Sequence, residues 1–148
     1  MKMIAPQAHP TADWKGLADS LHYSSSHIIG IGIRGVNPHD LKCWLYYPED
    51  DCPFYRCTVF SHYAEGNCPK ADAKLRTLQL ASGEKVEGGE EKEGPYWSLM
   101  LEVSESKAFK PVDLEKVVQE TIQGCLNVTL LKPESEIVSI YHRRLEHG

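Results

Sequence analysis

Apolar residues recur at every second position in several stretches of the chain, which is the period of β-strands. The clearest stretch is 96–105, where Trp97, Leu99, Leu101 and Val103 share one face and Ser98, Glu102 and Ser104 share the other. The same period predicts further strands over 26–34, 43–47, 54–63 and 136–145, and a short one at Leu78–Leu80. The chain therefore favours a sheet of about five or six strands with one face on a core.

A helical spacing of three and four residues appears in one long segment that Pro111 and Asp113 open. Its single apolar stripe consists of Leu114, Val117, Val118, Ile122 and Leu126, and such a stripe is typical of a helix that covers one face of a sheet. A short helix is predicted over 11–20, with Thr11 as its N-cap. Strands followed by one helix and a final strand predict an α+β fold with a mostly antiparallel sheet.

Glycines at 30, 32 and 35 spell the G-x-G-x-x-G pattern of a dinucleotide-binding turn. That turn works only between a strand and a helix, and the residues around Pro38 begin no helix. Read at period two, Ile29, Ile31 and Ile33 share one face while the glycines fall on the other. The pattern therefore predicts a strand whose glycine face is closely approached, twisted or simply tolerant of small residues.

Composition narrows the class of protein. A chain of 148 residues with 41% hydrophobic residues predicts one folded domain. A net charge of −5 argues against nucleic acid as a partner. The absence of a long apolar segment predicts a cytoplasmic protein without a membrane span. The Gly- and Glu-rich segment 81–94 is predicted to be a flexible loop.

Five cysteines, an odd number without a secretory signal, favour reduced thiols. A zinc site built from Cys52, Cys57, His62 and Cys68 is the alternative. The chain has no C-x-x-C pair, and Cys57 fits the alternation of a strand. No metal is therefore predicted.

An arginine in the middle of an aromatic strand is the most informative position. Trp44 and Tyr46 share one face of "CWLYY", and Arg56 shares a face with Phe54 in "FYRCTVF". A half-buried guanidinium needs a carboxylate or an anionic ligand, and neighbouring rings offer stacking surface for a base or a sugar. The residues alone leave both possibilities open. They identify no nucleophile or other catalytic residue.

Four runs of the chain carry a resemblance to a known family. They are "HYSSSHIIGIGIRG", "KCWLYYPEDDCPFYRCTVFSHY", "KEGPYWSLMLEVSES" and "EIVSIYHRRLEHG". From about Ala18 onward the chain resembles the central segment of eukaryotic, fungal-type UDP-galactopyranose mutases. The resemblance implies a flavoprotein isomerase that uses reduced FAD to interconvert UDP-galactopyranose and UDP-galactofuranose, a sugar of the fungal cell wall. It also implies that 1–148 is a single partial domain, the substrate-binding sheet of a larger FAD-dependent fold.

The resemblance also implies four substrate-binding residues. Arg56 matches the family's diphosphate-binding arginine, Tyr46 an active-site tyrosine, and Trp44 the tryptophan beside it. Tyr63 matches a tyrosine at the end of the same strand. Because Tyr63 and Arg56 differ in parity, both reach one pocket only if a bulge or a strand end lies between them.

The family's glycine-rich FAD turn and its later arginine and tyrosine ligands have no counterpart in this sequence. We therefore expect the chain alone neither to hold FAD firmly nor to turn over substrate, although UDP or UDP-galactose remains the expected ligand. Two alternatives stay open. One is the substrate domain of a related amine-oxidase-like flavoprotein, and the other is a non-catalytic remnant that binds a sugar nucleotide or a protein. Oligomerisation is possible in each case.

Overall fold

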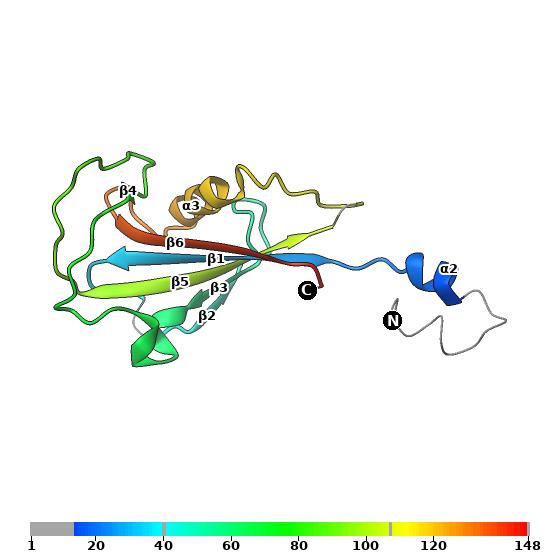
Figure 1. The fold of residues 1–148 in the computed structure, drawn as a ribbon, viewed down its shortest axis with the longest axis horizontal. Coiled ribbons are helices and arrows are strands. Elements are labelled where there is room, and N and C mark those ends of the chain that lie inside the picture. The colour runs from blue at the N-terminus through cyan, green and yellow to red at the C-terminus, as the bar shows by residue number, and fades with distance from the viewer. Residues whose placement is uncertain (1–13, 40, 107, 148) are drawn as a thin grey trace.

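A six-stranded antiparallel sheet with one long helix forms the body of the protein (Figure 1). The computed structural model describes residues 14–39, 41–106 and 108–147. The elements are α2 (Trp14–Asp19), β1 (Ser25–Arg34), β2 (Trp44–Tyr46), β3 (Arg56–Val59), η1 (Phe60–His62), η2 (Glu65–Asn67), β4 (Gln79–Leu80), β5 (Tyr96–Glu105), α3 (Val117–Asn127) and β6 (Glu136–Leu145). The strand order β2-β3-β5-β1-β6-β4 confirms the predicted α+β fold. Thr11, the predicted N-cap, lies outside the described residues.

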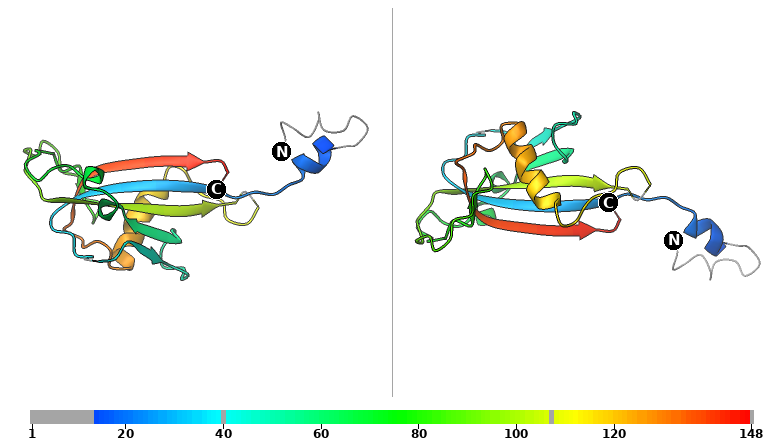
Figure 2. Two further views of the ribbon diagram at one scale, coloured as in Figure 1. Left: turned by 90° about the horizontal axis from the view of Figure 1, so that it is seen from below. Right: turned by 90° about the horizontal axis from the view of Figure 1, so that it is seen from above.

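The core lies between α3 and one face of the sheet (Figure 2). Along β1 every second residue is buried, and Ile29 pairs with Leu101 of β5 at the centre. Val117, Ile122 and Cys125 of α3 complete the buried cluster. No α-helix of the described residues covers the opposite face, which is called the open face below. No described helix is long and apolar enough to cross a membrane.

The glycine pattern belongs to a strand, as its alternation predicts. Gly30 and Gly32 lie on the open face of β1, opposite Tyr141 and Ser139 of β6. A Cβ at Gly32 would collide with Ser139 Oγ. Gly35 follows the strand with φ at +124°, a conformation that glycine adopts readily. The small residues therefore fit close cross-strand neighbours and a turn.

Two predicted boundaries are wrong for local reasons. The long helix begins at Val117. The Asp113 carboxylate accepts a hydrogen bond from the Glu115 N–H and the Asp113 carbonyl accepts one from the Val117 N–H, so residues 113–116 form a turn that leads into the helix. Leu114, predicted on the apolar stripe, is exposed. The strand predicted over 54–63 spans only Arg56–Val59. Phe54 precedes it and packs in the core, so it does not share the face of Arg56.

Candidate functional site

Three neighbouring strands place a row of polar side chains on the open face. Tyr46 of β2 lies opposite Arg56 of β3, and Arg56 lies opposite Glu102 of β5. Leu45, which precedes Tyr46 in sequence, and Cys57, which follows Arg56, face the core. Because neighbouring residues of a strand alternate between faces, the register brings Tyr46, Arg56 and Glu102 together.

Glu102 binds the Arg56 guanidinium through both carboxylate oxygens. Arg56 Nε donates to Oε1 at 2.8 Å and Nη2 donates to Oε2 at 2.8 Å. The Tyr55 hydroxyl donates to Oε2 at 2.6 Å. Hydrogen bonds to Glu102, which has the larger effect, and to Tyr46 raise the pKa of Arg56, so the guanidinium stays charged. The Glu102 side chain is 7% exposed, whereas the Arg56 side chain keeps 36% of its surface in solvent.

The structure also brings together the two outer aromatic residues. β3 ends at Val59, and the η1 turn redirects the chain before Tyr63. The Trp44 indole N–H donates to the Tyr63 hydroxyl, and the two rings meet edge to face at 6.1 Å between centroids. A strand end thus separates Tyr63 from Arg56, as the parity argument requires. Trp44 and Tyr46 are both more than half exposed, so their rings are accessible from the open face.

A mostly apolar groove of about 420 Å³ continues from this row along the open face. Gly30 and Gly32 of β1 and Met100 of β5 contribute to it. Its other lining residues include Phe60, Asn67, Pro69, Leu75, Tyr96 and Tyr141. Met100 lies opposite Thr58, so the groove and the Arg56 row are adjacent on the sheet. The arrangement offers an anion-binding guanidinium beside exposed aromatic surface.

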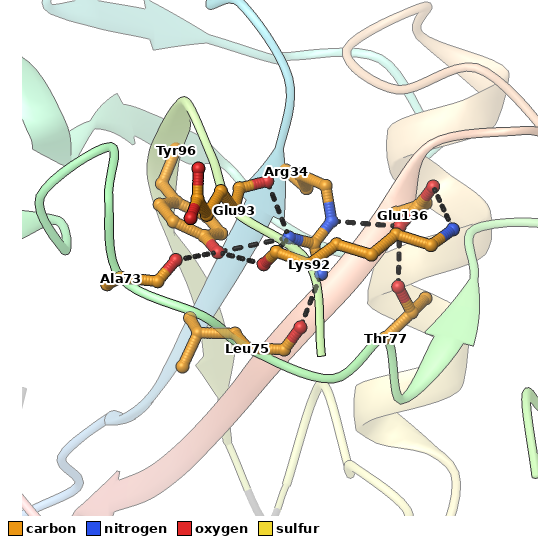
Figure 3. Close-up of polar contacts among 8 residues, drawn as sticks. All are labelled: Arg34, Ala73, Leu75, Thr77, Lys92, Glu93, Tyr96 and Glu136. Carbon is orange, nitrogen blue, oxygen red and sulfur yellow. Dashed lines mark hydrogen bonds and ion pairs between the residues drawn. The ribbon is translucent and has the colours of Figure 1, made fainter. Parts of the chain in front are cut away.

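Arg34 binds two loop segments beside this groove, one at Leu75 and one at Lys92 and Glu93 (Figure 3). Its guanidinium donates to the carbonyls of Leu75, Lys92 and Glu93, to the Tyr96 hydroxyl and to the Glu136 carboxylate. Leu75 and Tyr96 themselves line the groove. Thr77 also donates to Glu136, at 2.5 Å. We call these contacts the Arg34 clamp, and they tie one end of the predicted flexible loop 81–94 to the sheet.

Arg34→Lys is expected to loosen the segment 71–96 and to lower the free energy of unfolding by about 2 kcal/mol, since one ammonium cannot replace a planar fork of donors. Faster hydrogen exchange at Leu75 and Lys92, whose amides bond to each other's carbonyls, would report it. The control is Arg76→Lys, because Arg76 is exposed and pairs with Glu91 at 3.5 Å. Equal exchange in the two variants would contradict a clamp role for Arg34.

The residues of the alternative zinc site, Cys52, Cys57, His62 and Cys68, are not grouped as a set of metal ligands among the described residues. Burial raises the pKa of Cys52 to about 11 and that of Cys57 to about 12. All five cysteines are free, and no group of three or more His, Cys, Asp or Glu side chains in the described ranges is placed to hold a metal ion.

A second titratable cluster lies on the helix side of the sheet, near the start of β1 and the end of β6. The buried His27 has Nδ1 at 2.9 Å from His142 Nε2 and Nε2 at 3.2 Å from Glu105 Oε2. Arg144 Nε donates to the same oxygen at 2.5 Å, and Arg144 Nη2 donates to Ser25 Oγ. Burial lowers the pKa of His27, and the Arg144 hydrogen bond lowers the pKa of Glu105. This histidine cluster faces away from the Arg56 row. Arg143, which precedes Arg144 in sequence, is exposed on the open face.

Sequence reasoning missed two members of the site, Glu102 and Tyr55. Glu102 falls on the polar face of its strand, where nothing local separates a buried acid from a solvated one. A signal did exist, because Arg56 required an anion and Glu102 is the one carboxylate in the middle of the clearest alternating strand. Only the pairing of β3 with β5 shows that the two residues meet.

The chain is similar to a protein of known structure. No protein-family model matches the chain. Among solved structures, the chain matches the crystal structure of a reduced UDP-galactopyranose mutase with 44% sequence identity and a TM-score of 0.71. The match covers 92% of this chain but 24% of the mutase chain, so the protein spans about a quarter of that relative. This similarity in both sequence and fold supports membership of the chain in the UDP-galactopyranose mutase family.

Proposed function

We propose that the chain is the part of a flavin-dependent UDP-galactopyranose mutase that carries the sugar-nucleotide-binding face. The observation that carries the proposal is the Arg56 row, in which a charged guanidinium lies half-exposed beside Tyr46. A planar guanidinium matches the oxygens of a diphosphate. The edge-to-face pair of Trp44 and Tyr63 supplies aromatic surface for the sugar.

Arg56 would act through its charge. Negative charge grows on the β-phosphate when UDP separates from the sugar, and a guanidinium held in place before the reaction stabilises that charge. The Tyr46 hydroxyl beside the guanidinium would donate a further hydrogen bond to the same phosphate. Interconversion of the two ring forms of UDP-galactose, a cytoplasmic location and a use in fungal cell walls belong to the same proposal and rest on the resemblance.

FAD does not fit the residues of this chain by itself. A flavin dinucleotide needs a glycine-rich turn whose backbone N–H groups and helix N-terminus hold the pyrophosphate. The G-x-G-x-x-G pattern lies instead on β1, with Gly32 packed against Ser139. Within the described ranges no such turn follows the pattern, so the flavin would be held by residues outside this chain.

Calorimetric titration of UDP tests the proposal. We expect saturable binding by the chain, and binding about 10- to 100-fold weaker for Arg56→Ala, because a hydrogen bond to a charged group contributes about 1.5–3 kcal/mol. Arg76→Ala is the matched control, since it removes one exposed arginine far along the chain. Binding of UDP also separates a mutase from an amine-oxidase-like substrate domain. A folded chain that takes up no UDP would contradict the proposal.

A further inference from the structure

Arg56 would be a poor anion-binding group without support. Its side chain is long and keeps 36% of its surface in solvent, and a free arginine side chain loses up to about 2 kcal/mol of rotamer entropy when it is fixed. β3, which carries it, has only four residues. The position of the guanidinium therefore depends on side-chain contacts.

Glu102 binds one edge of the Arg56 guanidinium, the edge that carries Nε and Nη2. Its two oxygens take Nε and Nη2, each at 2.8 Å, and these contacts do not involve Nη1. The Glu102 side chain is nearly buried, at 7% exposure, so it is held in place by the sheet around it. A bidentate pair of this kind fixes both the distance and the plane of an arginine.

Tyr55 completes the support from the other side of the carboxylate. Its hydroxyl donates to Glu102 Oε2 at 2.6 Å, and its backbone N–H donates to the Glu102 carbonyl at 3.0 Å. The Arg56 Cζ lies 5.9 Å from the centre of the Tyr55 ring. The burial that accompanies these contacts, together with the hydrogen bond to Glu102, raises the pKa of Tyr55, so the hydroxyl keeps its proton.

We infer that Glu102 and Tyr55 are positioning residues that hold Arg56 so that the guanidinium edge not taken by Glu102 is ready for the diphosphate of a uridine nucleotide. The inference rests on the proposed function. Three donors share one carboxylate, namely Arg56 Nε, Arg56 Nη2 and the Tyr55 hydroxyl. Loss of the hydroxyl leaves the Glu102 carboxylate freer to rotate, so the guanidinium that it binds is less firmly fixed. A less firmly fixed guanidinium binds a phosphate more weakly.

The test compares UDP affinity in Tyr55→Phe and Glu102→Gln, with Arg56→Ala beside them. We expect UDP to bind about three- to tenfold more weakly to Tyr55→Phe and more than tenfold more weakly to Glu102→Gln. Tyr23→Phe is the matched control, because the Tyr23 hydroxyl donates to the Glu146 carboxylate at 3.0 Å on the exposed surface. It should bind UDP like the unaltered chain.

A second readout follows the side chain of Arg56 itself. The nitrogen-15 spectrum of the unaltered chain should show a protected Arg56 Nε–H resonance, which Glu102→Gln should lose by exchange with water. A purely structural role would lower the unfolding temperature without changing UDP affinity at a temperature where the variant is folded. If Glu102→Gln does not fold, the UDP affinity of Tyr55→Phe decides whether the positioning role holds.

The outcomes separate this inference from the proposed function. UDP binding that Arg56→Ala weakens, but that Tyr55→Phe and folded Glu102→Gln leave unchanged, would overturn the positioning role and leave the proposed function standing. A folded chain that binds no UDP would overturn both. Weaker binding in both variants, with loss of the protected resonance in Glu102→Gln, is the expected result.

Discussion

Gly124→Ala is expected to lower the free energy of unfolding by about 1 to 3 kcal/mol, the usual cost of overfilling a packed core. Gly124 is buried in α3 against the segment that leads into β3. An added Cβ would lie 2.8 Å from Pro53 Cδ and 2.9 Å from Cys52 Cβ. At an open helix position the same change stabilises by about 1 kcal/mol, so the sign of the effect identifies close packing.

Urea unfolding of Gly124→Ala and of Gly66→Ala measures this effect. Gly66 lies in a surface turn with open space where a Cβ would stand, so its replacement should change stability by less than about 0.5 kcal/mol. Because the displaced segment leads directly to Arg56, Gly124→Ala should also weaken UDP binding. A Gly124→Ala chain as stable as the unaltered one would contradict close packing of α3 against Pro53.

Acidification is expected to destabilise the protein through the histidine cluster. The pKa of His27 is lowered from its ordinary value of 6.5, so the unfolded chain takes up this proton at a higher pH than the folded chain. Stability from neutral His27 is present above pH 6.5 and is lost as pH falls toward the folded pKa. The pKa of Glu105 is lowered from 4.5, so its contribution is lost at still lower pH.

Glu105→Gln tests the cluster most directly. It removes the partner of both His27 and Arg144 from a site where Glu105 is 12% exposed, so we expect a loss on the order of 3 kcal/mol at pH 7.5. Glu91→Gln, at an exposed pair with Arg76, should cost less than about 0.5 kcal/mol. Urea midpoints at pH 7.5, 6, 5 and 4 complete the test. A flat stability profile between pH 7.5 and 5 would refute the role of His27.

Long, regular elements were predictable from the sequence. The period-two pattern places β5 at 96–105 and β6 at 136–145, the bounds that the structure has. The glycine pattern of β1 was also correctly read as a strand, because Pro38 excludes the helix that a cofactor turn requires. These segments depend on local alternation and burial, which one sequence displays.

Features that depend on tertiary contacts were not predictable. Phe54 continues the alternation of β3, yet it packs beside Tyr47 in the core because α3 approaches the chain there. Arg56 showed that an anion was needed but not which one, and Glu102 lies 46 residues away. The binding roles of Arg56, Tyr46, Trp44 and Tyr63 remain predictions, although the structure brings Arg56 next to Tyr46 and Trp44 next to Tyr63.

The position of β1 has a consequence for how the chain acquires its structure. β1 is the first strand in sequence, but its two neighbours in the sheet are β5 and β6, which begin at residues 96 and 136. During synthesis, β1 therefore leaves the ribosome long before either neighbouring strand has been made. Until then the isoleucines of its core face stay exposed to solvent in the nascent chain. Folding dominated by such distant pairings is slow, roughly milliseconds to seconds, and a chaperone that shields residues 27–33 during synthesis would raise the yield of native protein.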